Sequence, residues 1–228
     1  MKLLRHFEKQ HIKRAVESGL LAKLQKGAMP FRKLMSYYKC AMMEIETKFR
    51  VLNEEFSLRY AQNPIESIRT RLKSPESLIM KMTNLGLPVT VESIESNLHD
   101  VAGVRVICSF IQDIYSLAEC LIGQDDVELI EQKDYIKNPK PSGYRSLHLI
   151  VRVPIFLENE KRLMKVEVQL RTIAMDFWAS LEHKLRYKKN ISPEILRELE
   201  GELEDCSNHI SAIDFRMQEI KNRISELK

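Results

Sequence analysis

The chain has 228 residues, of which 44% are hydrophobic and 30% charged, and its net charge is +4 at pH 7. This composition is typical of a soluble globular protein and excludes a disordered chain. The mild positive charge excludes a general nucleic-acid coat but allows a local basic patch that binds phosphates. Four cysteines without a CxxC pair predict neither zinc site nor disulfide framework, and no apolar segment has the length of a signal peptide or a membrane span. We therefore expect a reduced, cytoplasmic protein with no membrane partner.

Residues 1–62 are predicted to form an N-terminal helical segment. The first 28 residues are basic and compatible with a helix, and no function is predicted for them. From Phe31 to about Gln62, apolar side chains recur at spacings of three and four, which predicts one long amphipathic helix. Asn63-Pro64 is expected to end it.

Residues 63–188 are predicted to form an α+β domain. Its main strands alternate apolar and polar residues with a period of two, as a half-buried strand requires. The order of strands and helices predicts a mixed sheet of about five strands flanked by helices. The predicted strands are Ile65–Lys73, Val104–Phe110, Val127–Gln132, Ser146–Val153 and Lys165–Arg171.

Helix signals lie between and after these strands. Ser74 followed by Pro75 is a typical N-cap and first helical position. Gln112–Ile122 is amphipathic, and a helix is expected from Ile173 to about Lys188, with Trp178 and Leu181 on its core side. Lys133–Arg145 is predicted to be a basic loop, because it is rich in Pro, Gly and Asn.

Residues 189–228 are predicted to form a C-terminal amphipathic helix that begins at Ser192-Pro193. Its apolar positions follow one another in steps of three and four, as in a coiled coil. Such a seam must be buried against another helix, either the Phe31–Gln62 helix of the same chain or a helix of a second copy. We expect it to support a homo-oligomer. The seam comprises Leu196, Leu199, Leu203, Cys206, Ile210, Ile213, Met217, Ile220, Ile224 and Leu227.

The polar face of the predicted sheet suggests phosphate chemistry. The chain contains neither G-x-x-x-x-G-K-[ST] nor G-x-G-x-x-G, so side chains rather than a glycine-rich loop must neutralise phosphates. Asp100 at the start of one strand and Glu167 on the polar face of another offer hard oxygen ligands. Together with bound phosphates, two such carboxylates suit Mg²⁺.

Several motifs in order resemble the synthetase domain of the RelA/SpoT family. They are His99–Arg105 (HDVAGVR), Lys140–His148 (KPSGYRSLH), Glu167–Thr172 (EVQLRT) and Trp178–His183 (WASLEH). The resemblance covers residues 63–188 in register, and the chain most resembles a small alarmone synthetase of the RelP type, with a nucleotidyltransferase-like synthetase domain. No residues are left for a hydrolase domain, so a synthetase alone is expected.

The resemblance implies transfer of pyrophosphate from ATP to the ribose 3′-hydroxyl of GTP or GDP. The products would be AMP and guanosine penta- or tetraphosphate, the alarmone of the stringent response. It also implies a homotetramer formed through the terminal helices. GDP or GTP preference is left open.

The resemblance also implies roles for individual residues. Asp100 and Glu167 match the catalytic Mg²⁺ ligands, and Glu167 also matches the base for the 3′-hydroxyl. Arg71 and Arg105 match the pair around adenine, and Lys73, Ser77 and Lys81 match groups that hold ATP phosphates. The guanosine side is matched by Tyr144, which stacks on the base, and by Lys133, Lys140, Arg145, His148, Gln169 and Arg171. Asp176 departs from part of the family, since it stands where many relatives have Asn next to the guanine. Its carboxylate can accept from the base, and the alternative of a solvated helix residue stays open.

Two other classes of function stay open from the residues alone. An RNA-binding module would use the basic loop and Tyr144, and would show affinity that falls steeply with salt but no nucleotide turnover. A coiled-coil scaffold would leave the sheet inert, which the carboxylate and arginines on the polar face disfavour. The enzyme is the preferred hypothesis, and a nucleic-acid partner is not expected.

Overall fold

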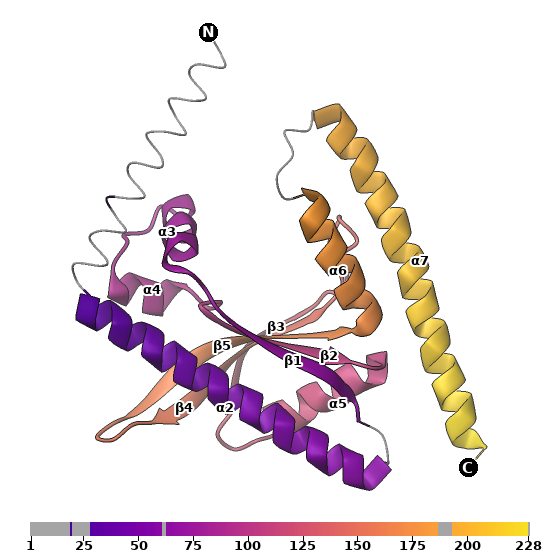
Figure 1. The fold of residues 1–228 in the computed structure, drawn as a ribbon, viewed down its shortest axis with the longest axis horizontal. Coiled ribbons are helices and arrows are strands. Elements are labelled where there is room, and N and C mark those ends of the chain that lie inside the picture. The colour runs from indigo at the N-terminus through magenta and orange to yellow at the C-terminus, as the bar shows by residue number, and fades with distance from the viewer. Residues whose placement is uncertain (1–18, 20–27, 61–62, 187–192, 228) are drawn as a thin grey trace.

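The computed structural model describes residues 19, 28–60, 63–186 and 193–227 (Figure 1). Its centre is a five-stranded sheet in the order β1-β2-β5-β4-β3. β2 and β5 are parallel, and the other neighbours are antiparallel. The predicted α+β class with a mixed sheet is confirmed. The strands are β1 (Ile65–Leu72), β2 (Ala102–Cys108), β3 (Glu128–Asp134), β4 (Leu147–Phe156) and β5 (Lys161–Thr172).

One face of the sheet is apolar and the other polar, because apolar and polar residues alternate along each strand. On β5, Val166, Val168 and Leu170 are fully buried, while Glu167 and Gln169 point to the opposite face. β3 extends through Lys133 and Asp134, so the predicted loop begins later than expected.

Two helices cover the apolar face. α2 (Ala28–Tyr60) contacts β1, β2, β4 and β5, and α5 (Ile111–Ile122) contacts β2 and β5. Figure 1 shows α2 crossing the sheet along much of its length. The apolar stripe predicted for this helix is the side that packs, because its members are buried: Leu34, Tyr38, Ala41, Ile45, Phe49 and Leu52. Most of the N-terminal 27 residues lie outside the described part of the chain.

Two short helices connect β1 to β2. In α3 (Pro75–Asn84), the Ser74 side chain accepts from the Ser77 backbone N–H, as the sequence predicted. α4 (Val91–Asn97) begins with the equivalent cap at Thr90. These caps fix the first residue of each helix. α3 therefore begins at Pro75, shortly after β1 ends at Leu72.

α6 (Ile173–Arg186) follows β5 without a loop. Trp178 is buried as predicted, but Leu181 is 43% exposed, so its predicted place on the core side is wrong. The reason is helical phase: Met175, Trp178 and Ala179 face inward, and Leu181 falls on a second stripe. That exposed stripe consists of Ile173, Phe177, Leu181 and Leu185.

α7 (Pro193–Glu226) packs beside α6 and α5 (Figure 1). The seam predicted from its heptads is largely open: Ile213 is 61% exposed, Met217 50% and Ile224 53%. The α2 helix of the same chain, one of the two expected neighbours, therefore does not bury it. The side chain of Leu196 lies outside the described side chains. Within the described ranges, no helix is both long and apolar enough to cross a membrane.

Candidate active site

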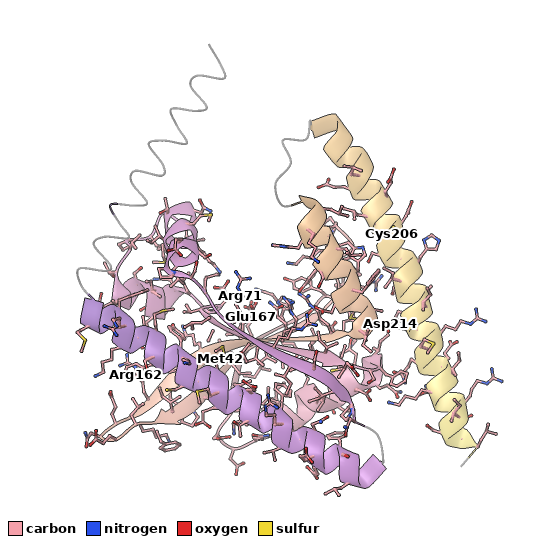
Figure 2. The ribbon with its side chains drawn as sticks, in the orientation of Figure 1. Met42, Arg71, Arg162, Glu167, Cys206 and Asp214 are labelled. Atoms are coloured by element: carbon pink, nitrogen blue, oxygen red, sulfur yellow. The ribbon has the colours of Figure 1, made fainter. Side chains whose placement is uncertain are left out.

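A cavity of about 430 Å³ lies over the polar face of β1, β2 and β5. The register aligns Arg71 with Gly103 and Gly103 with Glu167, so the two charged side chains flank a residue without a side chain. Figure 2 shows Arg71 and Glu167 next to one another at the middle of the sheet. Because Gly103 adds no side chain, the floor of the cavity stays open. Its lining residues are Arg69, Thr70, Arg71, Lys73, Asp100, Gly103, Val104, Arg105, Glu167 and Gln169.

Asp100 is held by two lysines at the mouth of this cavity. Its Oδ2 atom lies 2.6 Å from Nζ of Lys73 and 2.7 Å from Nζ of Lys81. Burial disfavours the charged carboxyl, but the hydrogen bonds and charges of the lysines outweigh it and lower the pKa of Asp100. Asp100 is therefore ionised at neutral pH. Its other oxygen, Oδ1, is buried without a hydrogen-bond partner, which is the arrangement expected of an atom that awaits a ligand.

Glu167 is also ionised. Burial and the charge of Asp100 act to raise the pKa of Glu167, but hydrogen bonds from His148 and Gln169 lower it overall. Nδ1 of His148 lies 3.3 Å from Oε1, and Nε2 of Gln169 donates to Oε2 at 2.9 Å. The two predicted carboxylates therefore share one cavity, and each is ionised and held by the neighbouring side chains that contact it.

A chain of hydrogen bonds connects Glu167 to the loop after β3. Nη2 of Arg171 donates to the Tyr144 hydroxyl at 2.5 Å, and that hydroxyl lies 2.8 Å from Nε2 of His148. The donor directions are consistent if Nδ1 of a neutral His148 carries the proton and Nε2 accepts from Tyr144. Gln169, which accepts from Arg171 at 3.1 Å, closes the network.

A second pocket, of about 170 Å³, lies on the other side of Glu167. Its aromatic wall is built by Tyr135, whose ring meets the Tyr144 and His148 rings edge to face at 6.0 and 5.2 Å. Nζ of Lys140 lies 4.6 Å from the Tyr135 ring centre and 5.0 Å from that of Tyr144. The pocket is lined by Glu131, Lys133, Tyr135, Lys140, His148, Ile150 and Glu167.

Asp176 forms ion pairs with three arginines beside the larger cavity and the Tyr144 network. Its Oδ1 lies 3.2 Å from Arg171 and 3.4 Å from Arg105, and its Oδ2 lies 3.2 Å from Arg69. The Asp176 side chain is only 10% exposed, so these charges interact in a partly desolvated place. In this arrangement Asp176 connects Arg105 of the larger cavity with Arg171 of the Tyr144 network.

Two predicted site residues lie apart from both cavities. Ser77 sits in the exposed first turn of α3, where its backbone N–H completes the cap. Arg145 donates to the Ile136 carbonyl at 3.1 Å and lines a small cavity against α7. The other predicted residues line a cavity or join one through the contacts above.

Sequence reasoning counted Arg69 among the side chains that could neutralise phosphates but assigned it no role at the site, and it missed Tyr135. Arg69 lines the larger cavity and binds Asp176, and Tyr135 forms the aromatic wall of the smaller pocket. The alternation of β1 was a usable signal for Arg69, because Arg69 and Arg71 lie two residues apart and so share a face. Tyr135 directly follows a strand, and no local pattern distinguishes it from a solvated tyrosine.

The arrangement can hold two anionic, planar ligands on either side of one ionised carboxylate. The larger cavity offers three arginines and a lysine, which suit phosphates and a flat aromatic ring. The smaller pocket offers two lysines and the ring of Tyr135, with the Tyr144 ring beside it. Glu167 lines both, so a group bound in one pocket can meet a group bound in the other at this residue.

The fold is that of the small alarmone synthetases. Small alarmone synthetase 2 from Bacillus subtilis is 41% identical and superposes with a TM-score of 0.75, covering 85% of this chain and 98% of that one. Small alarmone synthetase 1 from the same organism, solved with its product pppGpp, is 31% identical, with a TM-score of 0.76 over 86% of this chain and 98% of that one.

The sequence comparisons agree with the fold. The family described as "Region found in RelA / SpoT proteins" matches residues 70–192. GTP pyrophosphokinase YwaC of Bacillus subtilis (strain 168) is 43% identical over 187 residues, which are 82% of this chain and 88% of that protein. The chain belongs to the RelA/SpoT family, as its motifs indicated.

Proposed function

We propose that the protein is a GTP pyrophosphokinase that transfers the β,γ-pyrophosphate of ATP to the 3′-hydroxyl of GTP or GDP. The observation that carries this proposal is the position of Glu167 on the common wall of two basic pockets of different character. ATP would occupy the larger cavity, between Arg71 and Arg105, and the guanosine nucleotide the smaller pocket, beside Tyr144. The name of YwaC and the pppGpp-bound relative support the same activity.

In the proposed reaction the 3′-oxygen of the acceptor forms a bond to the β-phosphorus of ATP. The bond from that phosphorus to the α,β-bridging oxygen breaks, and AMP leaves with the electron pair. The proton of the 3′-hydroxyl passes to a carboxylate oxygen of Glu167. Because the pKa of Glu167 is lowered, this transfer becomes favourable only as the hydroxyl acidifies in the transition state.

Lysines and arginines neutralise the phosphates in this scheme. Lys73 and Lys81 form ion pairs with Asp100 at the edge of the larger cavity. From there their ammonium groups can also neutralise bound phosphates. Positioning and charge neutralisation supply most of the rate in phosphoryl transfer, which explains why no covalent nucleophile is needed.

Mg²⁺ fits the two carboxylates. Oδ1 of Asp100 is buried and unpartnered, and the described residues contain no group of three or more His, Cys, Asp or Glu side chains that could hold a metal. A cation here would rest on Asp100 and Glu167, with water and phosphate oxygens as its remaining ligands, which is the usual coordination of Mg²⁺. When bound, it would withdraw charge from the ATP phosphates.

The experiment is an incubation with Mg²⁺, ATP and GTP, followed by separation of the nucleotides. We expect AMP and a guanosine nucleotide with a 3′-pyrophosphate in equal amounts. ADP with inorganic phosphate, or no turnover together with RNA binding that falls steeply with salt, would overturn the proposal.

The open seam of α7 supports a homotetramer. Its exposed apolar residues lie along one line of the helix, and the stripe Ile173, Phe177, Leu181 and Leu185 of α6 is exposed as well. We also propose that residues 63–188 form the synthetase domain and residues 189–228 the oligomerisation segment. The predicted N-terminal helical segment, residues 1–62, lies partly outside the described residues. Because ATP and GTP are the proposed substrates, we propose that the protein acts in the cytoplasm.

A further inference from the structure

The side of α7 that packs on the rest of the chain is polar. Ser207, Ser211, Asp214 and Gln218 are each less than 9% exposed, whereas the apolar seam beside them is open. Polar groups are buried at a cost unless they are hydrogen-bonded. The polar side chains on this face of α7 therefore need hydrogen-bond partners in the rest of the chain. Those partners identify which parts of the site α7 contacts.

One of these partners is the loop that carries Tyr144. The Ser207 hydroxyl donates to the Gly143 carbonyl at 2.5 Å, and this contact is buried. Gly143 has φ +84°, and a Cβ placed on it would lie 2.6 Å from Cβ of Ser207. The loop backbone therefore lies directly against α7, and only a residue without a side chain allows this approach.

The position of Gly143 sets the positions of its neighbours. Its N–H donates to the Lys140 carbonyl at 2.8 Å, and the Lys140 N–H donates to the Tyr144 carbonyl at 3.2 Å. Lys140 lines the smaller pocket, and Tyr144 binds Arg171 and His148 beside it. A shift of Gly143 would therefore move both the cation and the aromatic ring of this side of the site.

Further bonds fix α7 itself in register. Thr172, the residue after Arg171, donates from its hydroxyl to Asp214 at 2.6 Å. Nε1 of Trp178 donates to the Leu203 carbonyl at 3.0 Å. Hydrogen bonds thus fix α7 against the end of β5 and against α6. This fixed position of α7 places Ser207 next to the loop.

We propose that Ser207 is a positioning residue for the guanosine nucleotide: its hydroxyl holds Gly143, and thereby Tyr144 and Lys140, in the shape that binds the acceptor. The proposal rests on the proposed function. Ser207 touches no substrate and acts through the loop. ATP binds in the other cavity, so its binding does not depend on this bond.

The test is Ser207→Ala in the full chain, assayed with Mg²⁺, ATP and GTP. Loss of one buried hydrogen bond to the loop should raise KM for GTP about fivefold, with KM for ATP and kcat nearly unchanged. Ser225→Ala is the matched control, because Ser225 lies exposed on the same helix and donates only to Lys221 within α7. It should behave as the unaltered protein. Fluorescence of Trp178, the single tryptophan, reports whether α7 stays docked.

Two further variants separate the possible failures. Gly143→Ala should raise KM for GTP more than Ser207→Ala does, because the added methyl meets Ser207 and the backbone is strained. This variant leaves the α7 sequence intact, so it tests the loop even if Ser207→Ala releases the helix. If both variants keep a normal KM for GTP while Tyr144→Ala raises it, the positioning role is wrong and the proposed function stands. If Tyr144→Ala also has no effect, the proposed acceptor site itself is wrong.

Discussion

Nδ1 of His148 lies 3.3 Å from Oε1 of Glu167, on the neighbouring strand of the sheet. This contact ties the proposed base to the acceptor pocket, because the other nitrogen of the same ring meets the Tyr144 hydroxyl. The carboxylate is therefore oriented by the elements that would bind the guanosine nucleotide. Binding and proton transfer share one set of hydrogen bonds.

Glu167→Gln should reduce synthesis at least about 100-fold. The amide keeps the size of the side chain but can neither accept the proton nor supply negative charge to a cation. AMP release measured in initial-rate assays checks this. Glu128→Gln is the control, because Glu128 is an exposed partner of Arg152 on the same sheet, away from both cavities. Near-normal turnover of the Glu167 variant would contradict its role as base.

Two substitutions of Tyr144 separate the ring from the hydroxyl. Tyr144→Ala removes the stacking surface and should raise KM for GTP about tenfold. Tyr144→Phe keeps the ring but breaks the bonds to Arg171 and His148, so it should bind GTP nearly normally and lower kcat, because Glu167 loses part of its support. Steady-state kinetics with varied GTP distinguishes these outcomes, and equal KM values in all three proteins would rule out stacking.

Asp176→Ala should weaken the fold as well as the site. Removing this carboxylate leaves Arg171, 5% exposed, beside Arg105 without the negative charge between them. Breaking a buried ion pair on one side costs about 3 kcal/mol. Urea unfolding measures the loss, and KM for both nucleotides should rise, since the arginines serve both cavities. A rise confined to GTP would indicate that Asp176 acts only at guanine, as the sequence resemblance implied.

The strands and the carboxylate pair could be predicted from the sequence because their signals are local or in familiar motifs. Alternation in Lys165–Arg171 places Glu167 opposite Val166 and Val168 without any knowledge of other elements. The pairing of Asp100 with Glu167 was inferred from their places on two predicted strands beside basic residues, and the resemblance then supported it, since no local pattern connects residues 67 positions apart.

The role of α7 could be predicted only in part. Its heptads identified the apolar seam but not which side of the helix meets the rest of the chain. Ser207 and Asp214 are polar residues on a charged helix, which locally look like solvated positions. Their partners Gly143 and Thr172 lie 64 and 42 residues away, and only the folded chain brings them together.

The α7 seam should control assembly. Ile213→Glu places a charge on its most exposed described apolar position apart from the C-terminal Leu227, and should shift the light-scattering mass from tetramer toward smaller species. Ala212→Glu adds the same charge to the adjacent exposed residue outside the seam and should leave the mass unchanged. If the Ile213→Glu variant keeps the mass of the unaltered protein, the α7 seam is not the interface.

Asp214 should make stability depend on pH. Burial raises the pKa of Asp214, although the Thr172 hydrogen bond and the charge of Arg145 partly oppose it. Between the ordinary carboxyl pKa and this raised value the folded chain holds a proton that the unfolded chain has released. The contribution of Asp214 to stability therefore falls as pH rises through that window. Asp214→Asn cannot ionise but can still accept from Thr172, so the stability of the variant relative to the unaltered protein should be greater at about pH 7 than at about pH 4. Urea unfolding of both proteins at the two pH values measures the difference, and an equal difference at both values would show that Asp214 does not titrate abnormally.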